Sequence, residues 1–477
     1  MIDGLQPYRE IRLTDLPWLP TIPVHWEVRR NGRLFAPRRE TGFPELPILE
    51  VSIGRGVRVR DLGDGGRKQQ MTDRAKYQRA VRGDLAYNMM RMWQGAVGVA
   101  PADGLVSPAY VVARPYPETS SAYYAYLFRT AAYMREVVVY SRGIVPDRNR
   151  LYWESFKQIP SPYPPLDEQR LIVRFLDWHG SQTAKLIGAK RQTIALLDEQ
   201  KQAIIHHAVT RGLDPKIKLK PSGIPRLGDI PKHWEVVRLG QVIKLTTGFP
   251  FKSEGFTSNE GDVRLLRGIN IGLGTIRWDS VVRWPEKDYK AYSGYMLSIG
   301  DIVLGMDRPL IANGIRVARI THDDIPALVL QRVARIRPSS RLTPEFGFIL
   351  LQGVGFCRYL TPIFTGISVP HLSPEQIKAF RIPLPAASEQ HFIVEHLERE
   401  TKKLKRSISI AQREIELLLE FRSRLITDVA TGKLDIRKLA ASLPENVGGP
   451  APLEVEGEVD EFEDSASEDF EPEEAAA

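Results

Sequence analysis

The chain has 477 residues, of which 43% are hydrophobic, with one cysteine and a formal net charge of +8 at pH 7. No run of about 18 apolar residues predicts a membrane span, and the N-terminus lacks the basic and apolar regions of a secretory signal, so we expect a cytoplasmic protein with no membrane partner. A single cysteine, Cys357, excludes an internal disulfide and fits a reducing compartment.

The net charge conceals two regions of opposite sign. Thirteen acidic residues lie between Glu445 and Glu474, and no Lys or Arg follows Lys438. The rest of the chain carries 66 basic and 45 acidic residues, a net charge of +21. A body this basic favours a nucleic-acid partner. Residues 439–477 combine acidic residues with Gly, Pro and Ala and have few aromatic residues, so we expect a disordered tail.

The sequence repeats itself. Residues 22–32 read IPVHWEVRRNG and residues 230–240 read IPKHWEVVRLG. Residues 162–214 align without a gap with residues 383–435, and sixteen of the 53 positions are identical. The chain therefore consists of one module of about 210 residues used twice, which is too long a period for a solenoid or a propeller.

Each copy begins with a variable globular part. Residues 46–60 and 263–284 are rich in β-branched residues and punctuated by glycine, which is typical of strands joined by turns. Short helices are predicted near residues 121–136 and 344–358. We therefore expect an α+β fold, with each globular part built on a curved antiparallel or mixed sheet.

A long helix is predicted after each globular part. Residues 167–210 and 388–431 contain no proline and are rich in Leu, Ile, Lys, Glu and Gln, and Gly212 and Gly432 follow where a left-handed residue can end a helix. An apolar seam recurs at equivalent positions, which predicts that the two helices pair as an antiparallel coiled coil. The alternative is that each helix packs on its own globular part. A 44-residue helix would be about 66 Å long, which suits a spacer. The seam comprises Ile187, Ile194, Leu197, Ile204, Ala208, Ile408, Ile415, Leu418, Leu425 and Val429.

The sequence thus predicts two tandem globular domains, each with its helix, and a tail. The parts are a first domain (1–160), a first long helix (161–213), a linker (214–229), a second domain (230–384), a second long helix (385–438) and the acidic tail (439–477).

Motifs for catalysis and cofactor binding are missing from the sequence. It contains no GxxxxGK[ST] phosphate loop, no complete dinucleotide fingerprint and no Asn/Asp-Pro-Pro-Tyr/Phe signature of an amino-methyltransferase. No Cys–His cluster has the spacing of a zinc site. His25 and His233 recur beside Trp26 and Trp234, which favours a structural role over catalysis. We therefore predict a non-catalytic binding protein with no catalytic, cofactor or metal residues.

Basic residues at loop-like positions are the remaining candidates for function, because Arg and Lys neutralise phosphates and can read base edges. The pair Arg91 and Arg308 stands at equivalent positions, beside the repeated Gly83-Asp84 and Gly300-Asp301 landmarks. The candidates in the first copy are Arg55, Arg58, Arg60, Arg67, Lys68, Arg91, Arg142, Arg148 and Arg150. Those in the second copy are Lys252, Arg267, Arg277, Arg308, Arg316 and Arg332.

This pattern resembles the specificity subunit of type I restriction–modification systems. The resemblance rests on two variable domains, each opened by an IPxHWEV segment and closed by a Pro-x-Pro-x-x-x-Glu-Gln segment (162–169 and 383–390) that begins a long helix. The connector at residues 212–224 is also similar. The resemblance covers residues 8–438 and does not extend to the acidic tail.

The resemblance implies that each domain reads one half of an asymmetric bipartite site in double-stranded DNA. The paired helices would set the spacer and dock two modification subunits, which use S-adenosylmethionine to methylate adenine. Restriction subunits, which use ATP and Mg²⁺, would join them, and this chain would bind none of these cofactors itself. Two alternatives remain: a methyltransferase or nuclease with a fused specificity module, and a coiled-coil scaffold or adaptor without DNA readout.

Overall fold

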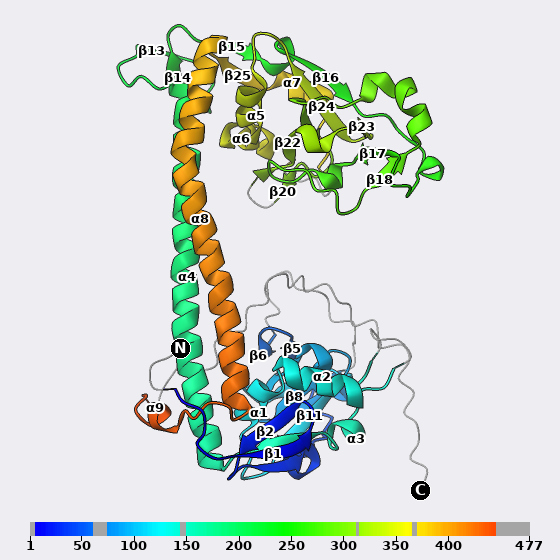
Figure 1. The fold of residues 1–477 in the computed structure, drawn as a ribbon, viewed down its shortest axis with the longest axis vertical. Helices are drawn as coiled ribbons and strands as arrows, with labels where there is room; N and C mark the ends of the chain where they lie inside the picture. Colours follow the sequence, from blue (N-terminus) through cyan, green and yellow to red (C-terminus); the bar gives the residue numbers. More distant parts are fainter. Residues whose placement is uncertain (1–4, 61–73, 144–148, 312–313, 365–369, 445–477) are drawn as a thin grey trace. The chain divides into compact units, whose positions relative to one another are not determined.

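The computed structural model describes residues 5–60, 74–143, 149–311, 314–364 and 370–444 (Figure 1). Its contacts divide the chain into two compact units, Met1–Lys190 with Arg413–Ala477, and Arg191–Gln412. Each unit therefore holds one globular domain together with a part of each long helix. The tail was predicted as residues 439–477. Its first residues complete a short helix, Arg437–Ala441, with Ala440 buried, so the expected disorder is wrong there. Residues 445–477 lie outside the described residues.

Two long helices dominate the chain, as predicted. They are α4 (Leu166–Arg211) and α8 (Ala387–Ala430), which run side by side in Figure 1. In the first unit, Phe175 near the start of α4 shares a core with Val429 at the end of α8. In the second unit, Val209 near the end of α4 shares a core with Ile393 near the start of α8. The antiparallel pairing is therefore confirmed.

The predicted seam lies inside this pairing. Six of its ten members are buried, with between 0% and 9% of the side chain exposed: Ile187, Ala208, Ile408, Ile415, Leu425 and Val429. The other four are partly buried: Ile194, Leu197, Ile204 and Leu418. In the first unit, an ion pair between Lys190 Nζ and Glu414 Oε2 at 2.6 Å also joins the two helices.

The first globular domain has a four-stranded antiparallel sheet with the order β4-β11-β8-β9. Helices α1 and α2 occupy the segment where one short helix was predicted, and α1 contacts β9. The elements are β1 (Ile11–Leu16), β2 (Leu19–Pro23), β3 (Glu27–Arg30), β4 (Phe35–Pro37), β5 (Leu49–Ser52), β6 (Gly56–Val59), β7 (Gln78–Ala80), β8 (Leu85–Asn88), β9 (Val97–Val99), β10 (Gly104–Val106), β11 (Tyr110–Pro115), α1 (Ser121–Leu127), α2 (Ala131–Tyr140), α3 (Trp153–Phe156) and β12 (Pro160–Tyr163).

The second globular domain repeats this plan, with a four-stranded antiparallel sheet in the order β16-β24-β19-β22. A second, mixed sheet has the order β18-β17-β23. The elements are β13 (Leu219–Pro221), β14 (Asp229–Pro231), β15 (Glu235–Arg238), β16 (Ile243–Thr247), β17 (Val263–Leu266), β18 (Val282–Trp284), β19 (Ile302–Gly305), β20 (Leu310–Ile311), β21 (Gly314–Ile315), β22 (Val317–Arg319), β23 (Ala327–Val329), β24 (Val333–Pro338), α5 (Pro344–Gln352), α6 (Val354–Phe364), α7 (Pro374–Ala379) and β25 (Arg381–Leu384). The short α9 (Arg437–Ala441) follows α8 and packs in the first unit. The predicted α+β class is confirmed.

The two repeated motifs contact each other in both copies. The opening segment forms β3, which pairs with β12 of the closing segment, and β15 pairs with β25 in the same way. His25 Nε2 lies 2.7 Å from Glu168 Oε2, and His233 Nε2 lies 2.9 Å from Glu389 Oε2. These histidines therefore tie each domain to the first turn of its long helix, which is the structural role predicted for them.

The glutamine of each closing motif is fully buried and makes the same hydrogen bonds in both copies. Gln390 Oε1 accepts a hydrogen bond from Thr343 N at 2.8 Å, and its Nε2 donates to the carbonyl groups of Arg341 and Pro385. Gln169 accepts from Ser120 N at 2.8 Å and donates to Pro164 O at 2.8 Å. Because Ser120 and Thr343 are the N-caps of α1 and α5, each glutamine joins a domain helix to the base of a long helix.

Within the described residues, no single helix is long and apolar enough to cross a membrane. Helices α5 and α6 pass the test of length and composition only as a pair, with a bend of 48° between them. Both contribute buried side chains to the core of the second domain, including Phe346 and Phe356.

Candidate nucleic-acid interface

The ends of three strands of the second domain, β19, β22 and β24, bring basic residues to one region. Gly305, at the end of β19, donates its N–H to Arg316 O at 2.9 Å, and Met306 N donates to Arg332 O at 2.9 Å. Leu372 N in turn donates to Met306 O at 2.8 Å. We call this region the second-domain rim. It comprises Arg267, Asp307, Arg308, Arg316, Arg332 and His371.

Two of the rim arginines donate hydrogen bonds to backbone carbonyl groups. Arg316 Nη1 donates to Gly268 O at 3.1 Å, and Arg267 Nη2 donates to Ser280 O. Both side chains are half-buried. They therefore fix the loop that follows β17, and they bring positive charge to the rim while doing so.

The centre of the rim is a contact among Asp307, Arg332 and His371. His371 Nδ1 lies 2.6 Å from Asp307 Oδ1. Arg332 Nη1 lies 3.1 Å from His371 Nδ1 and 3.5 Å from Asp307 Oδ1. All three side chains are between 41% and 56% exposed, so the group faces solvent and is accessible to a ligand.

Backbone strain marks the same place. Arg308 has φ of +43° and Arg332 has φ of +69°, and they are the two non-glycine residues with positive φ in the described part of the chain. Such conformations are uncommon for residues with a Cβ, and they concentrate at ligand-binding sites. Arg308 is exposed, and its backbone N donates to Pro370 O at 2.9 Å.

The first domain has a related region after β8. Met89 N donates to Ala109 O at 3.2 Å and Leu151 N donates to Met89 O at 2.9 Å, the same two bonds that surround Met306. Three of the candidate arginines lie beside these hydrogen-bonded segments. Arg91 Nη1 donates to Gln94 Oε1 at 3.0 Å, and the backbones of Arg142 and Arg150 are hydrogen-bonded to each other. We call Arg91, Arg142 and Arg150 the first-domain rim.

The other candidate residues lie away from the two rims or outside the described residues. Arg55, Arg58 and Arg60 lie on the hairpin of β5 and β6, where Arg55 is exposed at the turn and Arg58 forms an ion pair with Glu50. Lys252 and Arg277 are exposed on loops of the second domain. Arg67, Lys68 and Arg148 lie outside the described residues.

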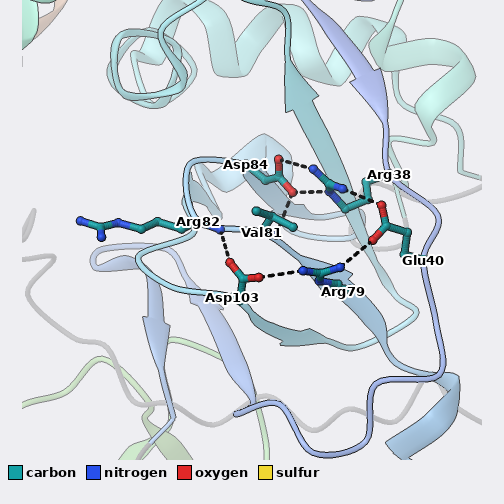
Figure 2. A network of polar contacts seen from close by, with 7 residues as sticks. All are labelled: Arg38, Glu40, Arg79, Val81, Arg82, Asp84 and Asp103. Carbon is teal, nitrogen blue, oxygen red and sulfur yellow. Dashed lines mark hydrogen bonds and ion pairs between the residues drawn. The ribbon is translucent and has the colours of Figure 1, made fainter.

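The repeated Gly-Asp landmarks have a structural role in both domains. Figure 2 shows Asp84 held by Arg38, through Nε at 2.6 Å and Nη2 at 3.3 Å, and by the backbone N–H of Val81. In the second copy, Arg337 Nε donates to Asp301 at 2.6 Å. Asp84 and Asp301 are 2% and 3% exposed, so each serves as a buried anchor for the turn that leads into the central strand.

The network in Figure 2 continues from Arg38 through Glu40 and Arg79 to Asp103. The Arg79 guanidinium holds the pKa of the Asp103 carboxyl below its usual range. The carboxylates balance these two arginines, which are therefore less suited to binding phosphate. By contrast, the exposed Arg82 side chain points away from the network, and only its backbone N–H contacts Asp103.

Asp307 and His371 were not among the candidate residues predicted from the sequence. Asp307 stands directly before the landmark Arg308, and this position was the only available signal. His371 reaches the rim because its segment pairs with the end of β19, where Asp307 and His371 form an isolated antiparallel bridge. Within the described residues, no group of three or more His, Cys, Asp or Glu side chains could hold a metal ion.

Known proteins are similar to this chain in sequence and in fold. Residues 231–416 match the family model described as the type I restriction modification DNA specificity domain. The chain is 32% identical over 285 residues to the type I restriction enzyme MjaVIII specificity subunit of Methanocaldococcus jannaschii, which covers 60% of this chain. It is 29% identical over 362 residues to the EcoAI specificity subunit of Escherichia coli, again covering 60% of this chain. The matches span 64% and 61% of the lengths of these two relatives.

A solved structure from a study of the assembly and conformational transition of the type I restriction–modification system has the same fold. It superimposes with a TM-score of 0.61 at 15% identity and covers 86% of this chain and 98% of that one. The duplicated domains on paired helices therefore share the fold of that structure. The resemblance to the specificity subunit of type I restriction–modification systems found in the sequence is confirmed by these matches.

Proposed function

We propose that this chain is the subunit of a type I restriction–modification complex that reads DNA sequence without catalysing a reaction. Each globular domain would read one half of an asymmetric bipartite site in double-stranded DNA. The observation that carries the proposal is the repeated rim: in both copies, arginines gather at the same end of the same four-stranded sheet. The net charge of +21 before the acidic tail supports binding to a polyanion.

The unequal rims support an asymmetric site. The first-domain rim presents arginines beside Gln94, whereas the second-domain rim combines arginines with Asp307 and His371. Different donors and acceptors match different base edges. The two half-sites should therefore differ in sequence.

The partners belong to the same proposal. Two modification subunits would dock on α4 and α8, and restriction subunits would join them. Leu417 and Phe421 support such docking, because they lie one turn apart on α8 with 47% and 41% of their surfaces exposed. S-adenosylmethionine, ATP and Mg²⁺ would be bound by those partners and not by this chain. The proposed location is the cytoplasm, because the proposed complex acts on cellular DNA.

An exchange of domains tests the proposal. The full chain is co-expressed with its modification subunits, and methylated adenines are mapped by single-molecule sequencing. Replacing residues 30–160 with the same segment of a relative should change one half of the methylated site and leave the other half unchanged. A change in both halves, or methylation without any sequence preference, would contradict readout by separate domains.

A second arm tests the spacer. One heptad is inserted at equivalent points of both long helices, so that the apolar seam stays in register. The expected result is a methylated site with a longer spacer and the same half-sites. New bases within the half-sites would show that the helices do not act as the spacer.

A further inference from the structure

We propose that Arg332 reads the two-acceptor edge of a guanine in the half-site of the second domain, and that Asp307 and His371 are positioning residues that orient its guanidinium. This inference rests on the proposed DNA-reading function and names the base class and the side chain that recognises it.

The backbone of Arg332 is left-handed, with φ of +69°. A left-handed conformation costs a residue with a Cβ roughly 1–2 kcal/mol, and glycine would avoid that cost. A turn needed only for folding would have no use for a long cationic side chain at this position. The left-handed backbone aims the Arg332 side chain from the start of β24 toward Asp307 and His371, which come from two other segments.

His371 and Asp307 contact one side of the Arg332 guanidinium. The contacts of Arg332 with His371 and Asp307 all pass through Nη1, within the residues that the structure describes. Nε and Nη2 lie on the other side of the planar group and form a second fork of two parallel donors. Guanine presents N7 and O6 as two parallel acceptors in the major groove, and arginine is their commonest partner.

The charge around a guanidinium separates a base contact from a phosphate contact. Asp307 lies 3.5 Å from Arg332 Nη1, so its carboxylate offsets the positive charge of the guanidinium. The charges of Arg332 and Asp307 are equal and opposite, so this pair carries no net charge. Such a group attracts phosphate weakly but keeps its directional donors, and directional donors are what base recognition requires.

Arg341 offers a matched control in the same domain. It is 52% exposed and its Nη2 donates to Glu235 at 2.7 Å, against 56% exposure for Arg332 beside Asp307. Arg341 follows β24, whereas Arg332 precedes it, and its backbone φ is not left-handed. Replacing either arginine with alanine removes one exposed, carboxylate-paired cation, and only Arg332 belongs to the rim.

The test uses the full chain with its modification subunits and a duplex library randomised across the second half-site. For the unaltered chain, we expect selection of at least one guanine. Arg332→Ala should reduce discrimination at a single guanine position by about 5- to 150-fold and leave the other positions unchanged. Arg332→Lys should not restore discrimination, because lysine keeps the charge but lacks the fork. Asp307→Asn should relax the same position by a smaller factor, and Arg341→Ala should leave the profile unchanged.

Other outcomes separate the failure of this inference from that of the proposed function. If Arg332→Ala weakens binding to all sequences equally and lowers the salt dependence, Arg332 contacts phosphate and the guanine assignment is wrong. An unchanged profile for Arg332→Ala, or full rescue by Arg332→Lys, would also overturn it. If the unaltered complex selects no sequence at all, the proposed function itself fails. Circular dichroism of each variant confirms folding, and Arg332→Lys remains informative if the alanine variant does not fold.

Discussion

A glycine follows the end of each long helix, and replacing it with alanine should have different effects in the two copies. The two glycines have the same backbone conformation, but the space around an added Cβ differs. Gly212 and Gly432 have φ of +77° and +76°, so alanine would carry the same left-handed strain at both, roughly 1–2 kcal/mol. A Cβ at Gly212 would lie 3.4 Å from the ring of Trp234, which is an ordinary contact. A Cβ at Gly432 would lie 2.5 Å from Pro23 Cδ and 2.9 Å from the ring of Trp26.

Both neighbours of Gly432 are buried, and Trp26 is only 1% exposed, so they have little room to move. Overpacking of this kind costs about 1–3 kcal/mol more. We therefore expect Gly212→Ala to cost about 1–2 kcal/mol and Gly432→Ala about 2–5 kcal/mol of local stability.

Hydrogen exchange followed by mass spectrometry measures this difference, because it reports the opening of each unit separately in the full chain. Gly432→Ala should accelerate the exchange of peptides in the first unit, and Gly212→Ala should accelerate those in the second unit by a smaller factor. Each 1.4 kcal/mol corresponds to about tenfold faster exchange. Equal acceleration by the two variants would refute the argument that Gly432 is required for the close approach of Trp26.

Three further predictions concern buried polar groups. Gln390→Ala removes three hydrogen bonds and leaves buried partners unpaired, so urea unfolding should show a loss of about 2–4 kcal/mol, and a loss below about 1 kcal/mol would contradict its role at the base of α8. Asp84→Asn breaks a buried ion pair and should lower the stability of the first domain by about 3–5 kcal/mol. Asp103→Asn breaks a more exposed pair and should cost far less. Equal shifts of the unfolding temperature in the two variants would contradict this prediction. Burial lowers the pKa of His206, so the unfolded chain binds the proton more readily and Tm should fall as the pH drops below about 6.5. His206→Gln should reduce that fall in Tm. If His206→Gln and the exposed control His391→Gln have the same pH dependence, the prediction is wrong.

Much of the fold was predictable because its signals are local. The helix-favouring composition and the absence of proline in residues 167–210 and 388–431 predict α4 and α8 to within one residue at each end. Burial of seam members such as Ile187 and Ile415 follows from the same pattern. The duplication predicts that both domains share one plan, and the two four-stranded sheets have equivalent strand orders.

The candidate site was predictable only in part. Arg308 and Arg332 appeared among the candidates because loop-like basic residues are typical of nucleic-acid binding. Their separation from arginines with structural roles, such as Arg58, was not predictable. Arg58 pairs with Glu50 across a hairpin, and only the strand register shows that the two side chains face each other.

The sequence by itself determined that one module occurs twice, that each copy ends in a long helix, and that the body is basic. These properties depend on composition, on repetition and on periodicity along the chain. The tertiary structure decided which side chains meet. His371 lies 64 residues beyond Asp307, and Glu168 lies 143 residues beyond His25. Contacts across such separations depend on the path of the whole chain, because sheet pairing and core packing, and not local preference, bring the segments together.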